Sequence, residues 1–441
     1  MQLRATRLTC IAHAARRAVA PAAYTPALLF ASGEQGAWYD PSDPTTLFQD
    51  AAGTVPVTAV EQPVGRMLDK SGRGNHATQS TAINRPVLSA RVNRLLGTED
   101  LTGVNWVKES SGTGNAPVVT SGFEAPDGTL TAFRLQLNKG VGASSADLSL
   151  LKAQSFALSA LTKTSSIWIK SLSGTPSIVF RNSGARNDLI TISTEWVLYS
   201  LANITVSATE DIFQIILRGS FNTSNSCDLL LWHPDDRASN DGVGLPAYQR
   251  VNTATDYDTA GFPLYLRFNG TNSWMQTASI DFTGTDKMTA WAGVRKFTAQ
   301  GTLSFLYELS SSSEVSGGMF QQSAPGGFSQ YGFGSKGTVL ATATTIESIF
   351  AAPVTSVLTS IGNISGDQSI LRINGTQAAI NTTDQGTGNY GNYPLFIGAR
   401  AGNQFWFNGR LYPLIIRGAQ STAEQIAQTE TWVNGKTRAY A

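Results

Sequence analysis

Short runs in which apolar and polar residues alternate, each closed by glycine, proline or asparagine, dominate this chain. Runs such as 166–170 and 369–373 have the period of two that half-buried strands require. The helix signal lies near the end of the chain, where residues 421–424 (Ser-Thr-Ala-Glu) form a capping box and Gly435 is expected to end the helix. The pattern predicts an all-β fold with one short C-terminal helix.

Composition narrows the classes of function. The 441 residues are enough for two or three domains, and a formal net charge of +1 gives no electrostatic case for nucleic-acid binding. Charged residues make up 14%, so Ser, Thr, Asn, Gln and the 42 glycines must supply the polar surface. With two cysteines and three scattered histidines, neither a disulfide framework nor a His/Cys metal site is expected. No apolar run approaches the ~20 residues needed to span a bilayer.

The first ninety residues do not carry a core of their own. Between residues 36 and 90 the apolar positions are few and irregularly spaced, so this piece needs a partner elsewhere in the chain. Within it, the loop 69–77 reads Asp-Lys-Ser-Gly-Arg-Gly-Asn-His-Ala. Its glycines and asparagine take positive φ at little cost, so the chain can reverse tightly there.

Loop 69–77 resembles the Asp-x-Ser-Gly-x-Gly-Asn-His loop near the start of concanavalin A-like, laminin-G-type jelly rolls, where a Phe-Asp-Gly-x-x-Asp strand soon follows. Here the matching strand, Leu-Arg-Phe-Asn-Gly-Thr-Asn-Ser-Trp, is only found at 266–274. Later pieces keep the family order: Thr-Ala-Trp, Arg-Ile-Asn-Gly, Phe-Ile-Gly-Ala-Arg, Phe-Asn-Gly-Arg-Leu and the C-terminal helix. The resemblance implies one discontinuous jelly roll made of residues 34–90 and 262–441.

Residues 91–252 form a second pattern between these two pieces. Strand-like runs recur at short intervals with Gly, Pro or Asn between them, which favours a sandwich over βαβ units. Several pieces resemble, in order, a carbohydrate-binding-module-like β-sandwich that recurs in phage tail and other virion proteins. These pieces are residues 95–101, 105–108, 125–129 and 246–252. The resemblance implies a second jelly-roll β-sandwich inserted in the first, with residues 253–261 as a linker.

The N-terminal segment 1–33 is rich in arginine and has no acidic residue. It does not fit a secretory signal, because its apolar part is short and arginines follow it. It is also similar to an organelle transit peptide, and a solvated tail is the simplest interpretation. The functional interpretation is a particle-docking arm that becomes ordered on a larger assembly. The residues expected to dock are Arg4, Arg7, Arg16, Arg17, Tyr24 and Phe30.

The sequence contains no recognisable catalytic constellation. On this fold, a retaining glucanase carries paired carboxylates on one strand, ~5–5.5 Å apart, as Glu-x-Asp-x-Glu or Glu-x-Asp-x-x-Glu, and no such run occurs. Glu308 stands alone on its strand, and no Gly-x-Ser-x-Gly elbow, P-loop or zinc motif is present. We expect no enzymatic activity, no metal site and no cofactor. Asp281, Asp286 and Asp384 offer carboxylates to calcium, but no ligand series accompanies them.

Two loops that combine aromatic and amide residues are the candidates for glycan binding. Lectin-type sites stack sugars on Trp or Tyr and bind their hydroxyls through Asn, Asp, Gln or Arg. The candidate residues are Tyr390, Asn392, Tyr393, Asn403, Gln404 and Trp406. The alternative is that these aromatics cap the core, since an alternating strand would point Trp406 inward.

Together the resemblances imply a structural virion protein of a bacteriophage, as a tail fibre, spike or head fibre. In this hypothesis the arm binds tail or portal/adaptor proteins, and the sandwiches bind host cell-surface polysaccharide. The protein would be a homotrimer, assembled in the bacterial cytoplasm and located in the virion. The alternatives are an architectural or decoration protein without a ligand and a glycan-degrading enzyme.

Overall fold

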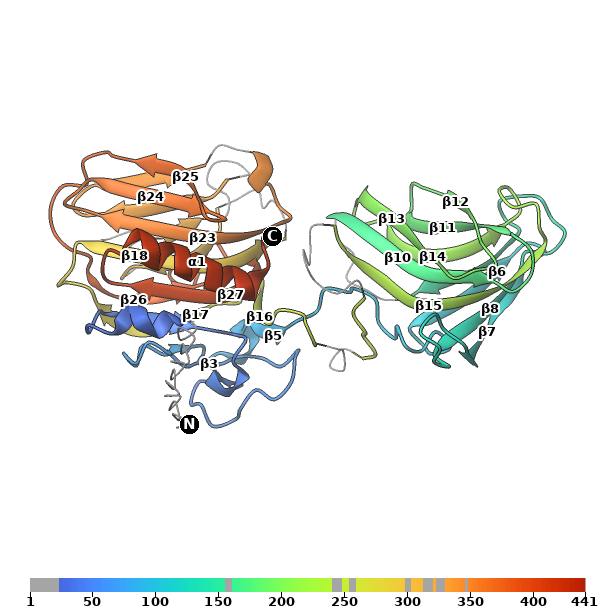
Figure 1. Cartoon of the computed structure of the whole chain (residues 1–441), viewed down its shortest axis with the longest axis horizontal. Helices are drawn as coiled ribbons and strands as arrows, with labels where there is room; N and C mark the ends of the chain where they lie inside the picture. Colours follow the sequence, from blue (N-terminus) through green and yellow to red (C-terminus); the bar gives the residue numbers. More distant parts are fainter. Residues whose placement is uncertain are drawn as a thin grey trace, which may run out of the picture.

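The structure is a computed structural model, and it describes residues 24–154, 161–239, 248–253, 259–297, 303–311, 320–322, 330–345 and 348–440. Its strands form four antiparallel sheets in two bodies, accompanied by a C-terminal α-helix (Figure 1). The predicted all-β class with one C-terminal helix is therefore confirmed. In the described part of the chain, no helix is both long and apolar enough to cross a membrane.

The first body packs two sheets face to face. One sheet runs, in spatial order, through β25 (Thr376–Asn381), β24 (Gln368–Ile373), β23 (Val354–Asn363), β18 (Lys287–Lys296), β27 (Asn408–Arg417), β16 (Tyr265–Asn269) and β5 (Val87–Ser89), and β1 (Gly36–Tyr39) also pairs with β27. The other runs through β2 (Leu47–Phe48), β3 (Arg66–Met67), β4 (Ala77–Thr78), β17 (Met275–Asp281), β26 (Asn392–Ile397), β19 (Phe305–Leu309), β20 (Phe320–Gln322), β21 (Gly332–Lys336) and β22 (Leu340–Thr344).

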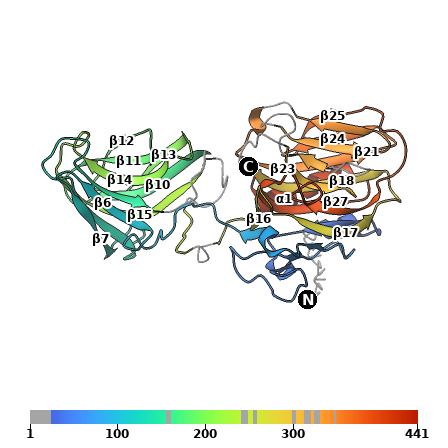
Figure 2. The ribbon, with the colours of Figure 1, turned by 180° about the vertical axis from the view of Figure 1, so that it is seen from behind.

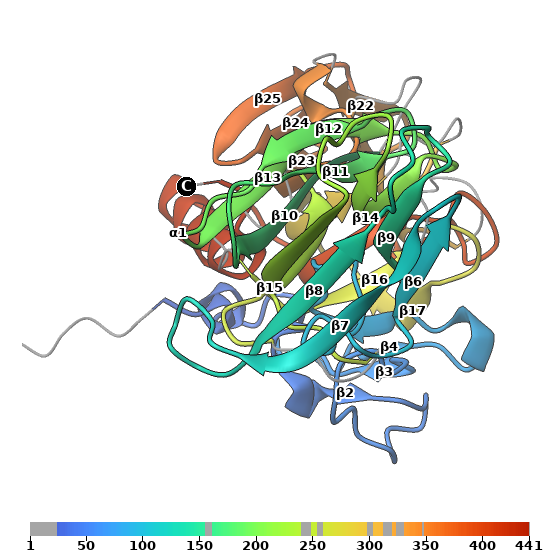
Figure 3. The same ribbon diagram turned by 90° about the vertical axis from the view of Figure 1, so that its right-hand side faces the viewer.

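The second body is a smaller sandwich whose two sheets lie one over the other (Figure 3). Its first sheet runs through β13 (Val197–Val206), β10 (Leu161–Ser171), β15 (Ser226–Ala238), β8 (Ala132–Asn138) and β7 (Asn115–Phe123). The other runs through β12 (Asp188–Thr191), β11 (Ser177–Ser183), β14 (Asp211–Arg218), β9 (Leu148–Ala153) and β6 (Trp106–Ser111). A single buried core that includes Ile167, Phe180 and Leu231 fills the space between them.

Both ends of the chain contribute strands to the sheets of the first body. β5 pairs with β16, β1 pairs with β27, and β4 pairs with β17 through Thr78 and Gln276. The Gln79 side chain also donates to the Trp274 carbonyl over 2.9 Å. Loop 69–77 and strand 266–274 therefore belong to the same sandwich, as the discontinuous jelly roll requires. The residue boundaries of the predicted domains stay a prediction.

Loop 69–77 is held by its own polar side chains. The Asp69 carboxylate accepts hydrogen bonds from the backbone N–H groups of Trp38 (2.9 Å) and Asn75 (3.0 Å). The guanidinium of Arg73 donates to the Phe30 carbonyl over 2.7 Å. The imidazole of His76 accepts from the Asp69 N–H over 3.0 Å. The loop thus fastens β1 and the N-terminal segment to the body.

Helix α1 (Ala423–Thr437) lies across the outer face of the first sheet, but its ends differ from the prediction. Thr422 is the N-cap, and its side chain and that of Gln425 form a reciprocal capping box. The predicted box is wrong because the Ser421 hydroxyl instead accepts from Arg417 over 3.0 Å. Gly435 does not end the helix. The left-handed residue is Arg438, and its N–H donates to the Asn434 carbonyl.

Short 3-10 turns complete the body. They are η1 (Pro26–Phe30), η2 (Pro44–Thr46), η3 (Ala82–Asn84) and η4 (Ser348–Phe350). η1 packs beside α1, where Phe30 is buried in a cluster with Trp291 and Val433. The Tyr24 hydroxyl hydrogen-bonds that of Thr429 at 2.5 Å. Phe30 is therefore wrong as a docking residue, because it is buried in its own chain. Tyr24 is only half-buried, and its docking role stays a prediction.

The remaining docking residues, Arg4, Arg7, Arg16 and Arg17, lie outside the described residues, so the arm stays a prediction for residues 1–23.

Two chain segments join the bodies, which lie side by side (Figures 1 and 2). The Gln249 side chain ties these segments together: it accepts from the N–H groups of Val92 and Asn93 and donates to the Ala90 carbonyl. A small apolar cluster with Val251 closes the joint. We call this joint, residues 90–93 with 249–251, the neck.

A buried charge cluster closes the second body next to the neck. The Lys163 ammonium, fully buried, lies 2.7 Å from an Asp211 oxygen and 2.8 Å from an Asp236 oxygen, and Arg94 also pairs with both aspartates. Every charge here has an opposite partner, which burial demands. The cluster is therefore part of the framework.

Candidate functional site

One of the predicted glycan-binding aromatics belongs to the core. Tyr390 is fully buried, and its hydroxyl hydrogen-bonds the Ser335 hydroxyl at 2.6 Å. Burial also raises the pKa of its phenol. A ring enclosed in this way has no face to offer a sugar, so Tyr390 is wrong as a stacking residue.

The other five candidates do not converge on one place. Asn392 and Tyr393 open strand β26, whereas Asn403, Gln404 and Trp406 follow its end. Five residue steps of strand span about 16 Å, so the two groups lie at opposite ends of β26. Glycan contact by these residues stays a prediction, at two separate places.

The aspartates considered for calcium are used within their own turns. Asp281 accepts from the Thr283 hydroxyl, Asp286 pairs with Lys287, and Asp384 accepts from the Gly386 N–H. Across the residues that the structure describes, no three His, Cys, Asp or Glu side chains gather in a way that could hold a metal ion.

A surface that the sequence analysis missed lies on the second body. On β10, Ile167 and Ile169 are fully buried in the core, while Trp168 and Lys170 alternate with them. Successive strand residues point to opposite faces, so Trp168 and Lys170 lie on the outer face of the sheet. We call the outer face of the sheet β13-β10-β15-β8-β7 the open face. Run 166–170 carries this signal, because its only tryptophan alternates with two isoleucines.

The centre of the open face is an aromatic row. Trp168 lies directly opposite Trp232 of β15, with ring centroids 6.4 Å apart and ring planes at 58°. On the other side of Trp168 the row continues with Leu198 of β13, which is 41% exposed. The Trp232 indole N–H donates to the Thr131 hydroxyl over 2.9 Å, which fixes the ring.

A polar row runs beside the aromatic one. The Arg134 guanidinium of β8 grips the Asp228 carboxylate of β15 with two nitrogens, one at 2.8 Å. Gln136, exposed, lies opposite Asp228 in the ladder. Lys170 lies opposite Leu230, which in turn lies opposite Arg134. The row therefore places a guanidinium, a carboxylate, an amide and an ammonium next to the two indoles.

Beyond Trp232 the aromatic row continues into a three-ring stack. The His233 ring lies 3.4 Å from Trp232 and 3.8 Å from Tyr248, nearly parallel to both. His233 has a positive φ of 50° at a register shift in β15, which turns its side chain out of the strand alternation. Burial lowers the pKa of its imidazole to about 4. The Tyr248 hydroxyl donates to Glu99, and burial raises the pKa of both groups.

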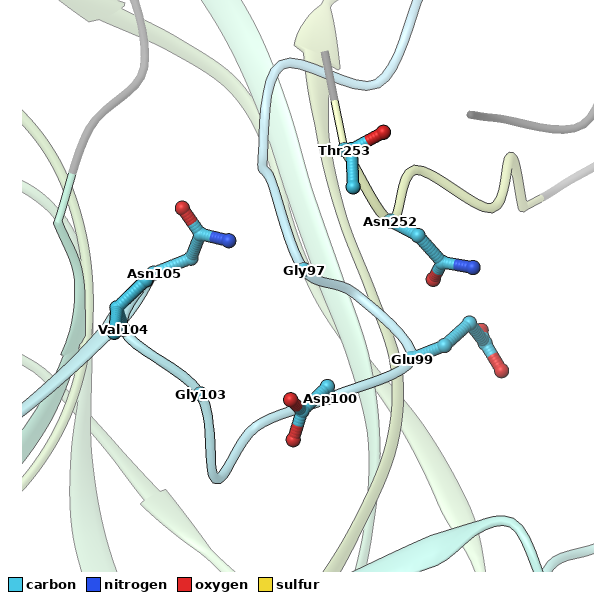
Figure 4. Close-up of a pocket in the computed structure, with 8 residues that line it drawn as sticks. All are labelled: Gly97, Glu99, Asp100, Gly103, Val104, Asn105, Asn252 and Thr253. Carbon is cyan, nitrogen blue, oxygen red and sulfur yellow. The ribbon is translucent and has the colours of Figure 1, made fainter. Parts of the chain in front are cut away.

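Glu99 also lines a pocket of about 340 Å³ between loop 97–105 and the chain at 252–253 (Figure 4). Asp100, Asn105 and Asn252 add polar groups to its wall. The Asp100 carboxylate accepts from its own turn, through the Thr102 N–H at 3.1 Å. The aromatic row therefore leads from the open face to the edge of this pocket.

This arrangement fits a ligand with a flat apolar face and a polar rim. Aromatic rings offer a broad apolar surface, and the polar groups that surround them fix the orientation of a ligand. The side chains of the two tryptophans and of the polar row stand on the paired strands β10, β15 and β8, and binding on rigid elements loses little conformational entropy. Sugar rings have this combination of C–H faces and equatorial hydroxyls.

Glu308, the lone strand acid, lies on the outer face of the second sheet of the first body and is fully buried. One of its oxygens lies 3.3 Å from Arg400, and the other accepts from the Ala401 N–H. Burial raises the pKa of this carboxyl to about 7, against the opposing effect of Arg400. This acid is therefore engaged by its own chain.

No protein-family model matches the chain, and no curated protein matches it by sequence. Among solved structures it is similar to a native heptameric SAP-like pentraxin from Limulus polyphemus, with 10% identity, 37% of this chain and 80% of that chain covered, and a TM-score of 0.31. It is also similar to domain 4 of the arabinanase AbnA from Geobacillus stearothermophilus in complex with arabinotriose (11% identity, 37% and 75% covered, TM-score 0.29).

A further similar structure is the carbohydrate-binding module CBM40 of a Ruminococcus gnavus sialidase, bound to α2,3-sialyllactose. Its identity is 15%, with 32% of this chain and 82% of that chain covered, and its TM-score is 0.27. At these identities and TM-scores the likenesses carry no argument about function, which must be argued from the residues of the open face.

Proposed function

We propose that this protein binds carbohydrate and does so through the open face of its second body. The observation that carries the proposal is the pairing of Trp168 with Trp232 on a sheet face that no described element covers, beside Arg134, Asp228 and Gln136. The indoles stack on the sugar ring, and the polar row binds its hydroxyls. Carboxylate and guanidinium are the stronger hydrogen-bonding partners for such hydroxyls.

The wider role we propose is that of a bacteriophage virion protein, in a tail fibre, spike or head fibre, that binds host-surface glycan. Support for this part comes from the resemblances in the sequence. The attachment segment we propose is residues 1–23, since Tyr24, Leu29 and Phe30 contact the first body. A trimer would add avidity to a weak sugar site.

Glycan binding is tested by retention of the purified chain on a glycan array and on host-surface polysaccharides. Trp168→Ala and Trp232→Ala are each expected to weaken binding about tenfold or more, about 1.4 kcal/mol, which lies within the range for truncating an aromatic anchor. Phe221→Ala is the matched control, because Phe221 is exposed at a turn after β14, away from this face. Equal binding by all three variants would contradict the proposal.

An architectural role is the second candidate, and the neck favours it. The hydrogen bonds of Gln249 and the apolar cluster around Val251 hold the two segments between the bodies together, as a spacer in an assembly requires. If the intact chain bound no glycan but virus particles could not assemble without it, the architectural role would be the one supported. We propose no catalysis, and release of reducing sugar from host polysaccharide would contradict that.

A further inference from the structure

We infer that the glycan bound by the open face is acidic, and that Lys170 recognises a carboxylate on the sugar that stacks on Trp168. The inference rests on the proposed function and names the class of its ligand. It starts from a difference among the lysines of the second body.

Residues 91–252 contain five lysines, and four of them have partners. Lys108 and Lys139 donate to backbone carbonyls at 2.7 and 3.0 Å, Lys152 pairs with a glutamate at 2.5 Å, and Lys163 lies in the buried charge cluster. Lys170 makes no hydrogen bond or ion pair within the described residues. Its ammonium is therefore available on the face that carries the tryptophans.

Within the described residues, none of the neighbouring charges pairs with this cation. Arg134, two strands away across Leu230, is neutralised by its paired carboxylate, Asp228. Glu195, exposed in the turn before β13, forms no ion pair in the part of the chain that the structure describes. The polar row thus carries one net positive charge, at Lys170.

The position of Lys170 matches a substituent on a stacked sugar. It follows Trp168 by two residues on the same face of β10, which places the two Cα atoms about 6.7 Å apart. A lysine carries its ammonium on a flexible four-carbon stem, so the charge can reach a carboxylate on a ring stacked on Trp168. Arg134, fixed by Asp228, cannot turn to the same group without breaking its bidentate pair.

The test compares uronate polysaccharides with their neutral forms. The probes are polygalacturonate, alginate and hyaluronate, each beside its carboxyl-reduced counterpart, and dextran sulfate serves as a general polyanion. The intact chain is expected to bind at least one uronate polymer more tightly than its reduced form. Lys170→Gln is expected to lower that affinity about three- to tenfold and to leave the reduced form unchanged.

Lys152→Gln is the matched control, because it removes the same charge from the opposite sheet of the second body. Lys170→Arg is expected to keep most of the preference, and added salt is expected to weaken it. Thermal unfolding of each variant checks that the body is intact.

Each outcome decides between the two proposals. Equal binding of acidic and reduced polymers, still lost in Trp168→Ala, overturns the inference and leaves the proposed function. Equal losses in Lys170→Gln and Lys152→Gln, or tightest binding to dextran sulfate, also overturn the inference, because they indicate unspecific attraction. No binding to any polymer, on the probes or on the array, overturns both.

Discussion

Tryptophan lies on the outer face of a sheet in both bodies, with opposite surroundings. In the first body, Trp38 and Trp291 point away from the main core, yet helix α1 and turn η1 cover them, and Trp38 meets Trp432 of the helix edge to face at 5.7 Å. In the second body, Trp168 and Trp232 are half-buried, and none of the helices that the structure describes lies over them. The same residue at the same kind of position is core in one body and surface in the other.

This difference shows that strand alternation decides which face a tryptophan takes but not whether that face is covered. In the first body the cover comes from the two ends of the described chain, η1 and α1, which contribute Leu29 and Val433 to the cluster. The second body is an internal segment of the chain, so it has no chain end that could pack over its sheet. Exposed aromatic residues of this kind either remain as a liability for aggregation or serve as a binding surface.

The largest effect is expected where the cover is complete. Trp291→Ala should lower the free energy of unfolding of the first body by about 3–5 kcal/mol, because the removed ring leaves a cavity under α1. Urea unfolding measures this. We expect the two bodies to unfold in separate transitions, of which Trp291→Ala should shift one and leave the other unchanged. A loss below about 1 kcal/mol would mean that the helix does not depend on the cluster.

The next effect is a dependence of stability on pH, and it comes from Glu308 on the outer face of the second sheet of the first body. The pKa of Glu308 is raised from 4.5 to about 7, so its neutral form is favoured in the folded state. The stability from this group is fully present below pH 4.5 and is lost as the pH rises through 7. Glu308→Gln should therefore flatten the fall in stability between pH 4.5 and 7, by on the order of 2–3 kcal/mol.

Denaturant unfolding at several pH values checks the Glu308 prediction. Glu424→Gln, an exposed change in the first turn of α1, is the control for the loss of one carboxylate. If the free energy of unfolding fell with pH as steeply in Glu308→Gln as in the unchanged protein, the Glu308 carboxyl would be ionised throughout this range.

A smaller effect on stability is expected on the open face. Trp168→Ala should change the free energy of unfolding by less than about 1 kcal/mol, because among the described residues no second layer of structure packs on this ring. The same variant should lose glycan binding. Thermal unfolding and array binding, measured on one sample, separate the effect on stability from the effect on glycan binding. A large loss of stability would make Trp168 a structural residue and remove the contrast with Trp291.

An effect of similar size tests where the cover of the first body begins. Tyr24→Phe removes one hydrogen bond to Thr429 and should cost about 0.5–1.5 kcal/mol. Deletion of residues 1–23 should leave the melting temperature unchanged, whereas deletion of residues 1–33 should lower it. If both deletions had the same effect, the boundary between arm and body would be misplaced.

Much of the fold could be predicted from local pattern, since alternation and turn residues are local. The joining of residues 36–89 to the second half could be predicted from loop 69–77 and the shortage of apolar residues. The burial of Tyr390 could not, because it depends on Ser335 of a distant strand. The docking role given to Phe30 failed for a related reason: an apolar segment that packs on a partner looks the same in sequence as one that packs on its own chain.

The candidate site was only partly accessible to sequence reasoning. The position of Trp168 between Ile167 and Ile169 was readable as an outward tryptophan, but Trp38 beside the buried Ala37 and Tyr39 gives the same pattern on a covered face. The pairing with Trp232 depends on the register between β10 and β15, and this register shifts at His233. Neither the cover nor the register is a local property.

The neck brings the start and the end of a long segment together through the side chains of Gln249 and Asn93 and the apolar cluster around Val251. For the first body, the second is therefore only a loop whose ends meet, and the entropy of closing a loop grows slowly with its length. The inserted second body can therefore be removed or exchanged at little cost to the folding of the first body. The proposed binding specificity could then change by replacement of the whole second body, while the first body stays the same.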